Sequence, residues 1–426
     1  MIDIKLIREN PDLVKKAATD KRLAVDIDQI LAVDARKRQL ETEFNDLRHQ
    51  QREAGEKIAK APKDEKAELS KAMGQIKNRL KAIDAEREGI EAELQQLMLL
   101  VPQVPDPDAP VGPDEACNVE IRRVGTTKAK AGFGFEFKDH LELGTNLGMI
   151  DVERGVKLAG SRNYVLRSDG ARLHEAVLRL AWDLMVERGF TPLTVPPLVN
   201  DRLMYGTGFF PLHQEEVYRC ERDDQSLVGT AEVPVTGYHA DEIIDEVELP
   251  KLYFARTTCF RREAGAAGKD TRGLYRIHYF DKLEQVVVCK ADAGESARWH
   301  EQILNNSEDL LRALDLPYRV IDICTGEMGQ GKVRMYDIET WMPSREAYGE
   351  THSASRFHDF QARRLNLRYR SAATGKPQYC HTLNNTVVAS PRILIPLLEI
   401  NQNADGSVTI PPKLRPYMNG LERIAV

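Results

Sequence analysis

The residue types best suited to chemistry are concentrated in one stretch, residues 260–284, which reads FRREAGAAGKDTRGLYRIHYFDKLE. A basic pair and a glutamate end one apolar run, and a loop rich in glycine and charged residues separates it from a second apolar run. We expect residues 251–263 and 277–288 to form two antiparallel strands joined by the loop 264–276. Because side chains on a strand alternate between its two faces, one face of this hairpin should collect polar and aromatic side chains.

That face would carry an aromatic ring, a guanidinium group and two carboxylates. Arg261 and Glu263 share it on the first strand, and Phe280, Lys282 and Glu284 share it on the second. A guanidinium group suits a phosphate, a flat ring can stack on a base, and a carboxylate accepts hydrogen bonds from an ammonium group or an amine. The pattern indicates a site for a nucleotide and an amino acid, although a surface hairpin with ordinary ion pairs would carry the same residues.

The loop between the two expected strands adds three cations, Lys269, Arg272 and Arg276, near the same face. Neither a Walker A sequence nor a GxGxxG sequence occurs in the chain, and the GTGFF segment that begins at Gly206 is too short to be a phosphate loop. The sequence therefore offers no glycine-rich phosphate loop of either kind.

Three further polar clusters are candidates for the same chemistry. Arg392 follows NNTVVASP at an expected helix start, where it could close over a phosphate or a base, or simply cap the helix. Glu350 and Ser353, in GETHSAS, offer the oxygen ligands that Mg²⁺ uses beside phosphates, although a polar turn would look similar. In GTAEVPV we expect Thr230 and Glu232 to share a strand face and to bind an ammonium group.

The N-terminal part of the chain has a different pattern. Apolar residues, or residues that a coiled-coil seam tolerates, recur at alternating spacings of three and four over residues 30–61 and again over 69–97. Pro62 interrupts the repeat. This heptad pattern predicts two helices, within about residues 30–100, that fold back as an antiparallel coiled-coil hairpin. A helix of about 32 residues would be roughly 50 Å long at ~1.5 Å per residue. The proline-rich sequence VPQVPDPDAPVGPDE predicts a linker, which we place at residues 103–117 after an N-terminal domain of residues 1–102.

Charge is unevenly distributed along this expected arm. Residues 48–81 hold ten Lys or Arg against five Asp or Glu, whereas residues 82–100 hold only Arg87 against five acids. The outer half is therefore basic and the root acidic. A solvated coiled-coil face would account for this, and so would a tip that meets a polyanion.

Residues 118–426 read as one α+β domain. Residues 171–189 have apolar positions at helical spacing and end at a glycine, and FTPLTVPPLVN follows as a strand-like segment. Several short β-rich runs come next without crossover helices of regular length. We therefore predict an antiparallel β-sheet flanked by helices.

Composition restricts the remaining possibilities. The chain has 426 residues, of which 42% are hydrophobic and 30% charged, with a formal net charge of −6, so two or three domains are expected and no chain-wide basic balance points to nucleic acid. The N-terminus lacks the apolar run of a signal peptide, and no stretch approaches the ~20 apolar residues of a membrane span. The six cysteines are scattered singly, so we expect a reduced, cytoplasmic protein without zinc.

These pieces together resemble the bacterial-type seryl-tRNA synthetases, a family of class II aminoacyl-tRNA synthetases. The likeness runs over essentially the whole chain, from IDIKLIRENPDLVKKA through the arm to DGSVTIPPKLRPYMNG. TAEVP resembles the family's serine-binding element, residues 260–284 resemble motif 2, and TLNNTVVASPRILIPLLE resembles motif 3. LTVPPLVN, with Pro196, resembles the motif 1 strand of the class II dimer interface.

The resemblance implies a role for individual residues. Implied ligands of ATP are Arg261, Arg262, Glu263, Arg276, Phe280, Glu350, Thr351, His352, Ser353 and Arg392. Implied ligands of serine are Thr230, Ala231, Glu232, Glu284, Asn384 and Thr386. Arg261, Arg392 and Glu350 would be catalytic, and Glu350 and Ser353 would hold Mg²⁺ on the triphosphate. Implied tRNA contacts on the arm are Arg48, Arg52, Lys71, Lys77 and Arg79.

Within the ATP site, the resemblance assigns a part to each group. Arg261 would bind the α-phosphate and the substrate carboxylate, and Glu263 would contact the adenine amine. Phe280 and Arg392 would sandwich the adenine, while Arg276 would face the terminal phosphates. Serine would attack the α-phosphorus of ATP, and the seryl group would pass to the 3′ end of tRNA(Ser), with tRNA(Sec) left open as a second acceptor.

The same resemblance implies a homodimer in which the arm of one subunit serves tRNA at the other, with no membrane and no zinc. Several positions depart from the family pattern: Arg262 replaces a common Ser, Tyr279 a common Gln, Thr386 a Ser, and His352 is a novelty beside the expected metal site. Two rival functions stay open. One is a paralogue that loads an amino acid onto a carrier protein, and the other is a non-catalytic RNA-binding regulator.

Overall fold

The chain divides into two units, Met1–Pro102 and Gln103–Val426, in a computed structural model that describes residues 1–266, 270 and 272–425. The first unit is helical. Its elements are α1 (Ile4–Glu9), α2 (Pro11–Asp20), α3 (Ile27–Lys60) and α4 (Lys66–Leu100). Asp26 begins α3 as its N-cap, where its side chain accepts a hydrogen bond from the backbone N–H of Gln29 at 2.9 Å.

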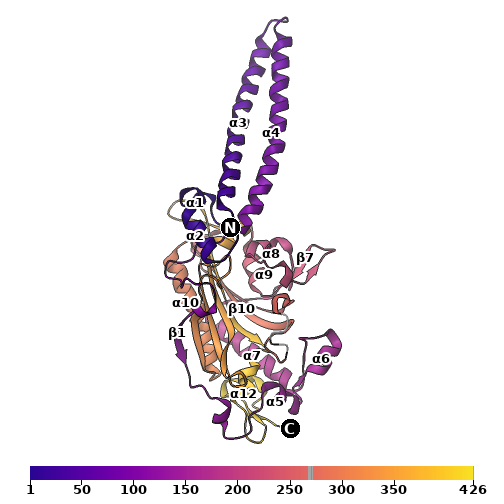
Figure 1. The fold of residues 1–426 in the computed structure, drawn as a ribbon, viewed down its shortest axis with the longest axis vertical. Helices are drawn as coiled ribbons and strands as arrows, with labels where there is room; N and C mark the ends of the chain where they lie inside the picture. The colour runs from indigo at the N-terminus through magenta and orange to yellow at the C-terminus, as the bar shows by residue number, and fades with distance from the viewer. Residues whose placement is uncertain (267–269, 271, 426) are drawn as a thin grey trace. The chain divides into compact units, whose positions relative to one another are not determined.

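Helices α3 and α4 form the predicted antiparallel hairpin (Figure 1). Interhelical ion pairs follow this direction, since Arg36 of α3 binds Glu86 of α4 at 3.0 Å, and Glu43, later on α3, binds Arg79, earlier on α4, at 2.7 Å. Rising residue numbers on one helix thus meet falling numbers on the other. The buried seam residues near the root are Ile30, Val33, Leu40, Leu80 and Ile83. The coiled-coil prediction is therefore confirmed.

The second unit is built on an eight-stranded sheet with the order β1-β11-β12-β13-β16-β10-β9-β4. Its strands are β1 (Val119–Val124), β4 (Thr191–Leu193), β9 (Lys251–Phe260), β10 (Tyr279–Cys289), β11 (Tyr318–Asp322), β12 (Arg334–Met342), β13 (Ala347–His358) and β16 (His381–Ser390). Every neighbouring pair is antiparallel except β4 with β9, which run parallel. The predicted antiparallel sheet is thus confirmed, with one parallel edge strand that the sequence pattern did not indicate.

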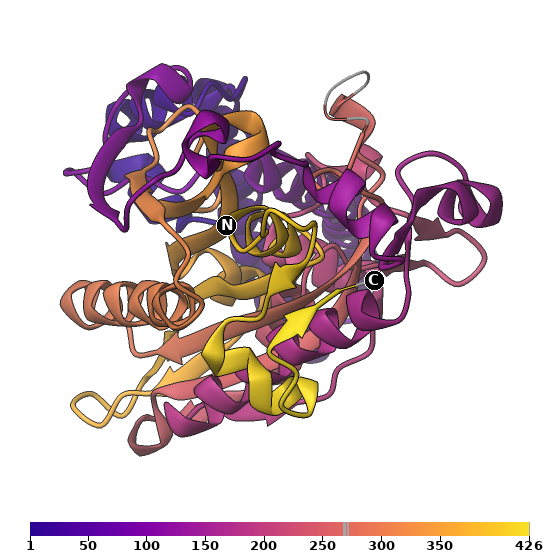
Figure 2. The ribbon, with the colours of Figure 1, turned by 90° about the horizontal axis from the view of Figure 1, so that it is seen from below.

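Helices cover one face of this sheet. Helix α7 (Asp169–Glu187) contacts β10 and β16, and α10 (Ala293–Ala313) contacts β10, β13 and β16 as well as α7. The chain leaves α7 at Gly189, whose φ of 78° lies in the left-handed region, as the predicted glycine stop requires. A C-terminal 3₁₀ segment, Pro412–Met418, packs along α7 (Figure 2), where Arg172 donates to the Met418 carbonyl at 2.8 Å.

The remaining elements are short and surround the sheet. The helices are α5 (His140–Asn146), α6 (Val152–Ala159), α8 (Asp201–Thr207), α9 (Glu232–Thr236), α11 (Phe360–Leu365) and α12 (Leu394–Ile400). The strands are β2 (Ile150–Asp151), β3 (Val165–Leu166), β5 (Leu198–Asn200), β6 (Arg219–Cys220), β7 (Gln225–Leu227), β8 (Ile243–Asp245), β14 (Arg368–Arg370), β15 (Pro377–Tyr379), β17 (Val408–Thr409) and β18 (Arg423–Ile424). Within the described residues, the helices are all too short or too polar to cross a membrane.

The central strands β10 and β16 position the site because both of their faces are covered. Almost every residue of β16 is buried, and so is the half of β10 from Lys282 onward. Polar side chains on strands that are covered on both faces must be hydrogen-bonded or face a ligand site, because an unpaired buried polar group is costly. Some of their polar residues, among them Glu284 and Asn384, line a cavity on one face, whereas Gln285 on the other face donates to the Ile303 carbonyl of α10 at 2.9 Å.

Candidate active site

A cavity of about 520 Å³ lies on the face of the large sheet that α7 does not cover. Strand alternation explains its lining, since Phe280, Lys282 and Glu284 of β10 point into it. Asp281, between them in sequence, instead contacts His174 of α7 on the opposite face. Asn384 of β16 joins the cavity lining beside them.

Most of the residues assigned to ATP and serine from the sequence line this one cavity. They are Thr230, Glu232, Arg261, Glu263, Arg276, Phe280, Glu284, Glu350, Thr351, Ser353, Asn384, Thr386 and Arg392. Three assigned residues do not line it. Ala231 is buried in an apolar cluster, Arg262 has an exposed side chain, and His352 is enclosed on the far side of its strand.

Glu232 is one of two buried acids that line the cavity among the described residues. Gln361 donates a 2.7 Å hydrogen bond to its Oε1. Burial and the neighbouring charge of Glu284 raise the pKa of Glu232 from 4.5 to about 7. A bound cation beside this carboxyl group would favour its ionised form.

The prediction that Thr230 and Glu232 share a strand face is wrong. Strand β7 ends at Leu227, the chain turns, and Glu232 is the first residue of α9. Thr230 accepts a hydrogen bond from the backbone N–H of Glu232 at 3.2 Å, as side chains do at the start of a helix. The turn still directs both side chains into the cavity.

Glu284 has a different set of partners. Lys282 lies two residues earlier on the same strand face, and its Nζ is 2.7 Å from Glu284 Oε2. Thr386, opposite Glu284 in the ladder, donates to the same oxygen at 3.3 Å. Next on β16, Asn384 is 4% exposed, and its Nδ2 has no hydrogen-bond partner among the described residues. A buried donor of this kind suits a ligand oxygen.

The charged hairpin of residues 260–284 is shorter than predicted. Strand β9 ends at Phe260, although Arg261 continues the ladder with a backbone hydrogen bond to the His278 carbonyl at 2.9 Å. Glu263 has left the strand with a φ of 54°, so it does not share a strand face with Arg261. It nevertheless lines the cavity, where its Oε2 binds Arg276 at 2.8 Å.

Of the three loop cations, Arg276 lines this cavity. Arg272 pairs with Asp139 at 3.3 Å and does not line the cavity, and Lys269 lies outside the described residues. Arg261 lies over the ring of Phe280, with 5.3 Å between the guanidinium carbon and the ring centroid. A cation and an aromatic ring are thus brought together as the strand pattern predicted.

Glu350 and Ser353 reach the same face through a β-bulge. Ile338 of β12 pairs with His352 and the next residue, Glu339, pairs with Glu350, so Thr351 is the extra residue on β13. Without the bulge, residues at odd spacing would point to opposite faces. The bulge turns Glu350 and Ser353 toward the cavity and His352 away from it.

His352 is held by two hydrogen bonds in the interior. Its Nδ1 lies 2.8 Å from Thr351 Oγ1, and its Nε2 lies 3.1 Å from the Val387 carbonyl. Burial lowers the pKa of His352 to about 3, so the ring is neutral at physiological pH. The expectation that it stands beside the metal site is not met, because the bulge buries it in the sheet.

Sequence reasoning missed Asp337, which faces Ser353 across the β12–β13 ladder. Ser353 hydrogen-bonds this carboxylate, while burial and the charge of Glu350 raise the pKa of Asp337 well above its usual range. Its buried Oδ1 has no partner among the described residues. The alternation of β12 (RMYDIETWM) could have revealed Asp337 only if its pairing with β13 had been known.

Sequence reasoning also missed Lys332, although the glycine-rich segment GQGK directly before a strand could have indicated it. It lines the cavity on the loop before β12, together with Gly329 and Gly331. Burial lowers the pKa of Lys332, while the charges of Asp337, Glu232 and Glu350 oppose that shift. The cavity thus contains, among its buried acids, a cation that the resemblance to the family motifs did not identify.

Arg392 lies just before α12, and its guanidinium group is held at the cavity wall. Its Nε donates to the Tyr275 carbonyl and its Nη1 to the Glu350 carbonyl, both at 3.0 Å. The guanidinium carbon also lies 4.5 Å from the centroid of the Tyr275 ring. Arg392 therefore connects the motif 2 loop to β13 at the rim of the cavity.

The arm residues assigned to tRNA fall into two groups. Arg79 is paired inside the arm, with Glu43 at 2.7 Å and Glu86 at 3.0 Å. Lys71 and Lys77 are exposed. Arg48, also exposed, lies 5.3 Å from the Phe44 ring, and Arg52 contacts His49 at 3.0 Å. The guanidinium group of Arg79 is therefore already paired with an acid on each of the two helices.

Comparison with known proteins matches both units of the chain. The family model for the seryl-tRNA synthetase N-terminal domain matches residues 1–105, and the model for the class II tRNA synthetase core domain (G, H, P, S and T) matches residues 218–401. A serine–tRNA ligase of Deinococcus radiodurans is 46% identical over 99% of this chain and 98% of its own length. One from Symbiobacterium thermophilum is 42% identical over 98% of both chains.

Solved structures agree with these matches. The crystal structure of seryl-tRNA synthetase from Pyrococcus horikoshii complexed with ATP has a TM-score of 0.92 and 38% identity, covering 100% of this chain and 99% of that one. A cytoplasmic serine–tRNA ligase from Naegleria fowleri in complex with AMP has a TM-score of 0.88 and 30% identity, covering 100% and 98%. With these relatives, this cavity and this arm, the chain belongs to the seryl-tRNA synthetase family.

Proposed function

We propose that this protein activates L-serine with ATP to seryl-adenylate and transfers the seryl group to the 3′ end of tRNA(Ser). The observation that carries the proposal is the meeting of two buried glutamates and two arginines in one cavity. Glu232 and Glu284 lie at its enclosed part, and Arg261 and Arg392 line the same space. The ammonium and hydroxyl groups of serine would bind the two glutamates. The negatively charged phosphates of ATP would bind the arginines.

The serine pocket follows from the partners of each glutamate. Glu232 is bonded to the neutral Gln361, so a serine ammonium group would supply its counter-charge. Glu284 is already paired with Lys282 and Thr386, and it would accept a hydrogen bond from the serine hydroxyl. Alanine would leave that buried acceptor unpaired, which is a strong basis for discrimination, whereas threonine must be excluded by size.

The ATP site is proposed around the hairpin. Arg261 binds the α-phosphate and the serine carboxylate, and Phe280 and Arg392 hold the adenine between them. Glu263 contacts the adenine amine, and its ion pair with Arg276 at 2.8 Å keeps that cation in the cavity, where the terminal phosphates would lie. Arg262 and His352 have no part in this proposal because neither lines the cavity.

The donor set around β13 fits a Mg²⁺ ion carried in with the nucleotide. Glu350 and Ser353 line the cavity, and Ser353 hydrogen-bonds Asp337 behind it, whose buried Oδ1 has no partner among the described residues. Hard oxygen ligands of this kind are those that Mg²⁺ prefers beside phosphates. When bound, the ion would offset the negative charge that develops on the leaving pyrophosphate.

The first step needs no protein nucleophile. A serine carboxylate oxygen attacks the α-phosphorus in line, a new P–O bond forms, and the bond to the β-phosphate oxygen breaks with release of pyrophosphate. In the second step a ribose hydroxyl at the tRNA 3′ end takes the seryl group and AMP leaves. The chain contributes positioning and charge stabilisation through Arg261 and Arg392.

The partners belong to the same proposal. The exposed cations of the outer arm would contact phosphate and sugar of the tRNA, reading its shape rather than its base edges. We place the protein in the cytoplasm as a homodimer, with the arm of one subunit serving tRNA at the other. Charging of tRNA(Sec), the second candidate acceptor, would be tested in the same assay as charging of tRNA(Ser).

ATP–pyrophosphate exchange with each amino acid in turn tests the proposal, with serine, threonine, alanine and cysteine as the critical four. We expect exchange that requires serine and Mg²⁺, followed by serine-specific charging of tRNA(Ser). Exchange with a different amino acid, or serine exchange without transfer to tRNA, would favour a paralogue that loads a carrier protein. Complete absence of exchange together with tRNA binding would favour a regulator.

A further inference from the structure

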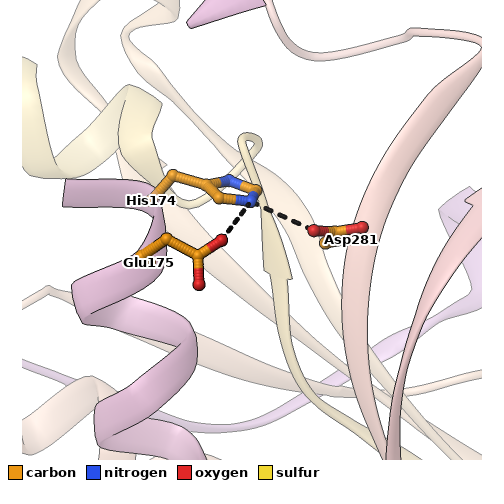
Figure 3. Close-up of side chains that lie close together, drawn as sticks. All are labelled: His174, Glu175 and Asp281. Carbon is orange, nitrogen blue, oxygen red and sulfur yellow. Dashed lines mark hydrogen bonds and ion pairs between the residues drawn. The ribbon is translucent and has the colours of Figure 1, made fainter. Parts of the chain in front are cut away.

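A polar cluster lies on the helix-covered face of the sheet, directly behind the cavity. His174 of α7 lies there beside Glu175 and Asp281 (Figure 3), and both of its ring nitrogens have partners. Its Nδ1 lies 2.8 Å from Ser390 Oγ, and its Nε2 lies 3.2 Å from Asp281 Oδ2. One imidazole thus connects the end of β16 to the start of β10.

The cluster is not arranged as a metal site. His174, Glu175 and Asp281 offer ligand atoms within 4.8 Å of one another, but Arg256 already occupies the carboxylates. Its guanidinium group donates to both oxygens of Glu175 and to Asp281 Oδ2, each at 2.7 Å. The Thr258 hydroxyl group donates a hydrogen bond to the other carboxylate oxygen of Asp281, Oδ1, at 2.7 Å. A cation would have to displace a guanidinium group that fits the site better.

The hydrogen bonds of the cluster indicate which ring nitrogen of His174 donates to Asp281. Although burial opposes the shift, the hydrogen bonds from His174, Arg256 and Thr258 lower the pKa of Asp281 well below its usual range, so this carboxylate is ionised and can only accept. The Nε2 atom of His174 therefore carries a proton. The other ring nitrogen, Nδ1, lies within hydrogen-bond distance of the Ser390 hydroxyl.

The position of the cluster links it to the nucleotide site. Asp281 and Ser390 are direct partners in the β10–β16 ladder. Phe280 immediately precedes Asp281 and points the opposite way, into the cavity, and Arg392 follows Ser390 by two residues and also lines the cavity. The two side chains proposed to hold the adenine therefore project from the two backbone segments that His174 ties together.

We infer that His174 is a positioning residue for the nucleotide, fixing the spacing of Phe280 and Arg392 through Asp281 and Ser390. This inference rests on the proposed function, because it concerns the adenine site of that reaction. His174 contacts no substrate and acts only through the two strand ends. Its loss should therefore weaken ATP binding while leaving the serine pocket, built from Glu232 and Glu284, unchanged.

The test measures KM for ATP and for serine in pyrophosphate exchange with His174→Ala, Ser390→Ala and the double variant. We expect each single variant to raise KM for ATP by about five- to tenfold, the size expected for a lost buried hydrogen bond, with KM for serine within about twofold of the parent. Because both changes break the same link, the double variant should be no worse than the poorer single variant. Multiplicative effects would overturn the inference.

Two controls separate positioning from general damage. His174→Gln keeps a donor and an acceptor in one side chain and should restore most of the ATP affinity. Glu175→Gln changes the neighbouring residue, which binds Arg256 and lies 3.9 Å from His174 Nε2 but does not contact Ser390, and should leave KM for ATP within about twofold of the parent. If His174→Ala does not fold, Ser390→Ala alone decides, since an unchanged KM for ATP in that variant would overturn the inference.

The parent protein separates this inference from the proposed function. Serine-dependent exchange by the parent establishes the reaction, whatever the His174 variants do. If the parent exchanges and the variants keep the parent KM for ATP, only the positioning role is lost. If the parent does not exchange, the proposed function itself fails.

Discussion

Glu232 and Glu284 line the same cavity, but their hydrogen-bond partners differ in charge. Lys282 lies 2.7 Å from Glu284, whereas the neutral amide of Gln361 lies 2.7 Å from Glu232. Burial, reinforced by the charge of Glu284, raises the pKa of Glu232 to about 7. If Glu232 binds the serine ammonium group as proposed, a pKa near 7 makes serine binding depend on pH.

The first prediction concerns this pH dependence. A raised carboxyl pKa means that Glu232 is largely protonated below pH 7 and ionised above it, and only the ionised form attracts the serine ammonium group. KM for serine should therefore fall about tenfold from pH 6 to pH 8 and then level off. Pyrophosphate exchange at saturating ATP measures it. Glu232→Gln should bind serine weakly at every pH, and a retained slope in that variant would refute the assignment.

The second prediction concerns Lys332, whose positive charge lowers the pKa of Glu232. Lys332→Met removes that charge with little change in shape, so Glu232 should ionise only at a higher pH. The inflection of the serine KM profile should move upward from about 7, and Lys332→Arg should keep it near the parent value. A Lys332→Met profile that overlays the parent would show that the ammonium group does not act on the serine pocket.

The third prediction concerns selection against alanine. Glu284→Gln should lower kcat/KM for serine about a hundredfold or more while changing the weak exchange with alanine much less, because only serine has a hydroxyl group for this acceptor. Thr386→Ser is the matched control, since it keeps the hydroxyl group that donates to Glu284 at 3.3 Å. Equal losses with both amino acids would mean that Glu284 serves the fold rather than the hydroxyl group.

The fourth prediction concerns the metal. Asp337→Asn should raise the Mg²⁺ concentration needed for half-maximal exchange by about tenfold, because this carboxylate hydrogen-bonds Ser353 beside the proposed ion. Binding of Mn²⁺ with a nonhydrolysable ATP analogue, followed by electron paramagnetic resonance, provides a readout independent of turnover. The control is Asp322→Asn, on the neighbouring strand β11, where the carboxylate instead pairs with Arg334. Its Mg²⁺ requirement should equal that of the parent.

The fifth prediction concerns the arm. Reversing the two exposed lysines, with Lys71→Glu and Lys77→Glu together, should weaken tRNA binding and lower the salt dependence by about one unit of slope per lysine. Pyrophosphate exchange should not change, because it does not involve tRNA. Arg79→Glu should instead lower the thermal stability of the arm, since Arg79 binds Glu43 and Glu86. Undiminished charging of tRNA by the double lysine variant would remove these residues from the interface.

Local patterns in the sequence were sufficient for the features that depend on one or two neighbouring elements. A heptad repeat must bury its apolar seam, so the hairpin of α3 and α4 followed directly from spacing. Period-two alternation placed Phe280, Lys282 and Glu284 on one face before any sheet was known. Motif similarity then added residues distant in the chain, such as Glu350 and Arg392.

Other features depended on contacts that only the folded chain makes. The bulge at Thr351 exists because β13 pairs with β12, and it decides that Ser353 enters the cavity while His352 is buried. The raised pKa of Glu232 requires the burial that tertiary packing provides, and the link between His174 and Ser390 joins residues 216 positions apart. A sequence determines which side chains alternate along a strand, but long-range strand pairing and burial decide which of them meet and how they ionise.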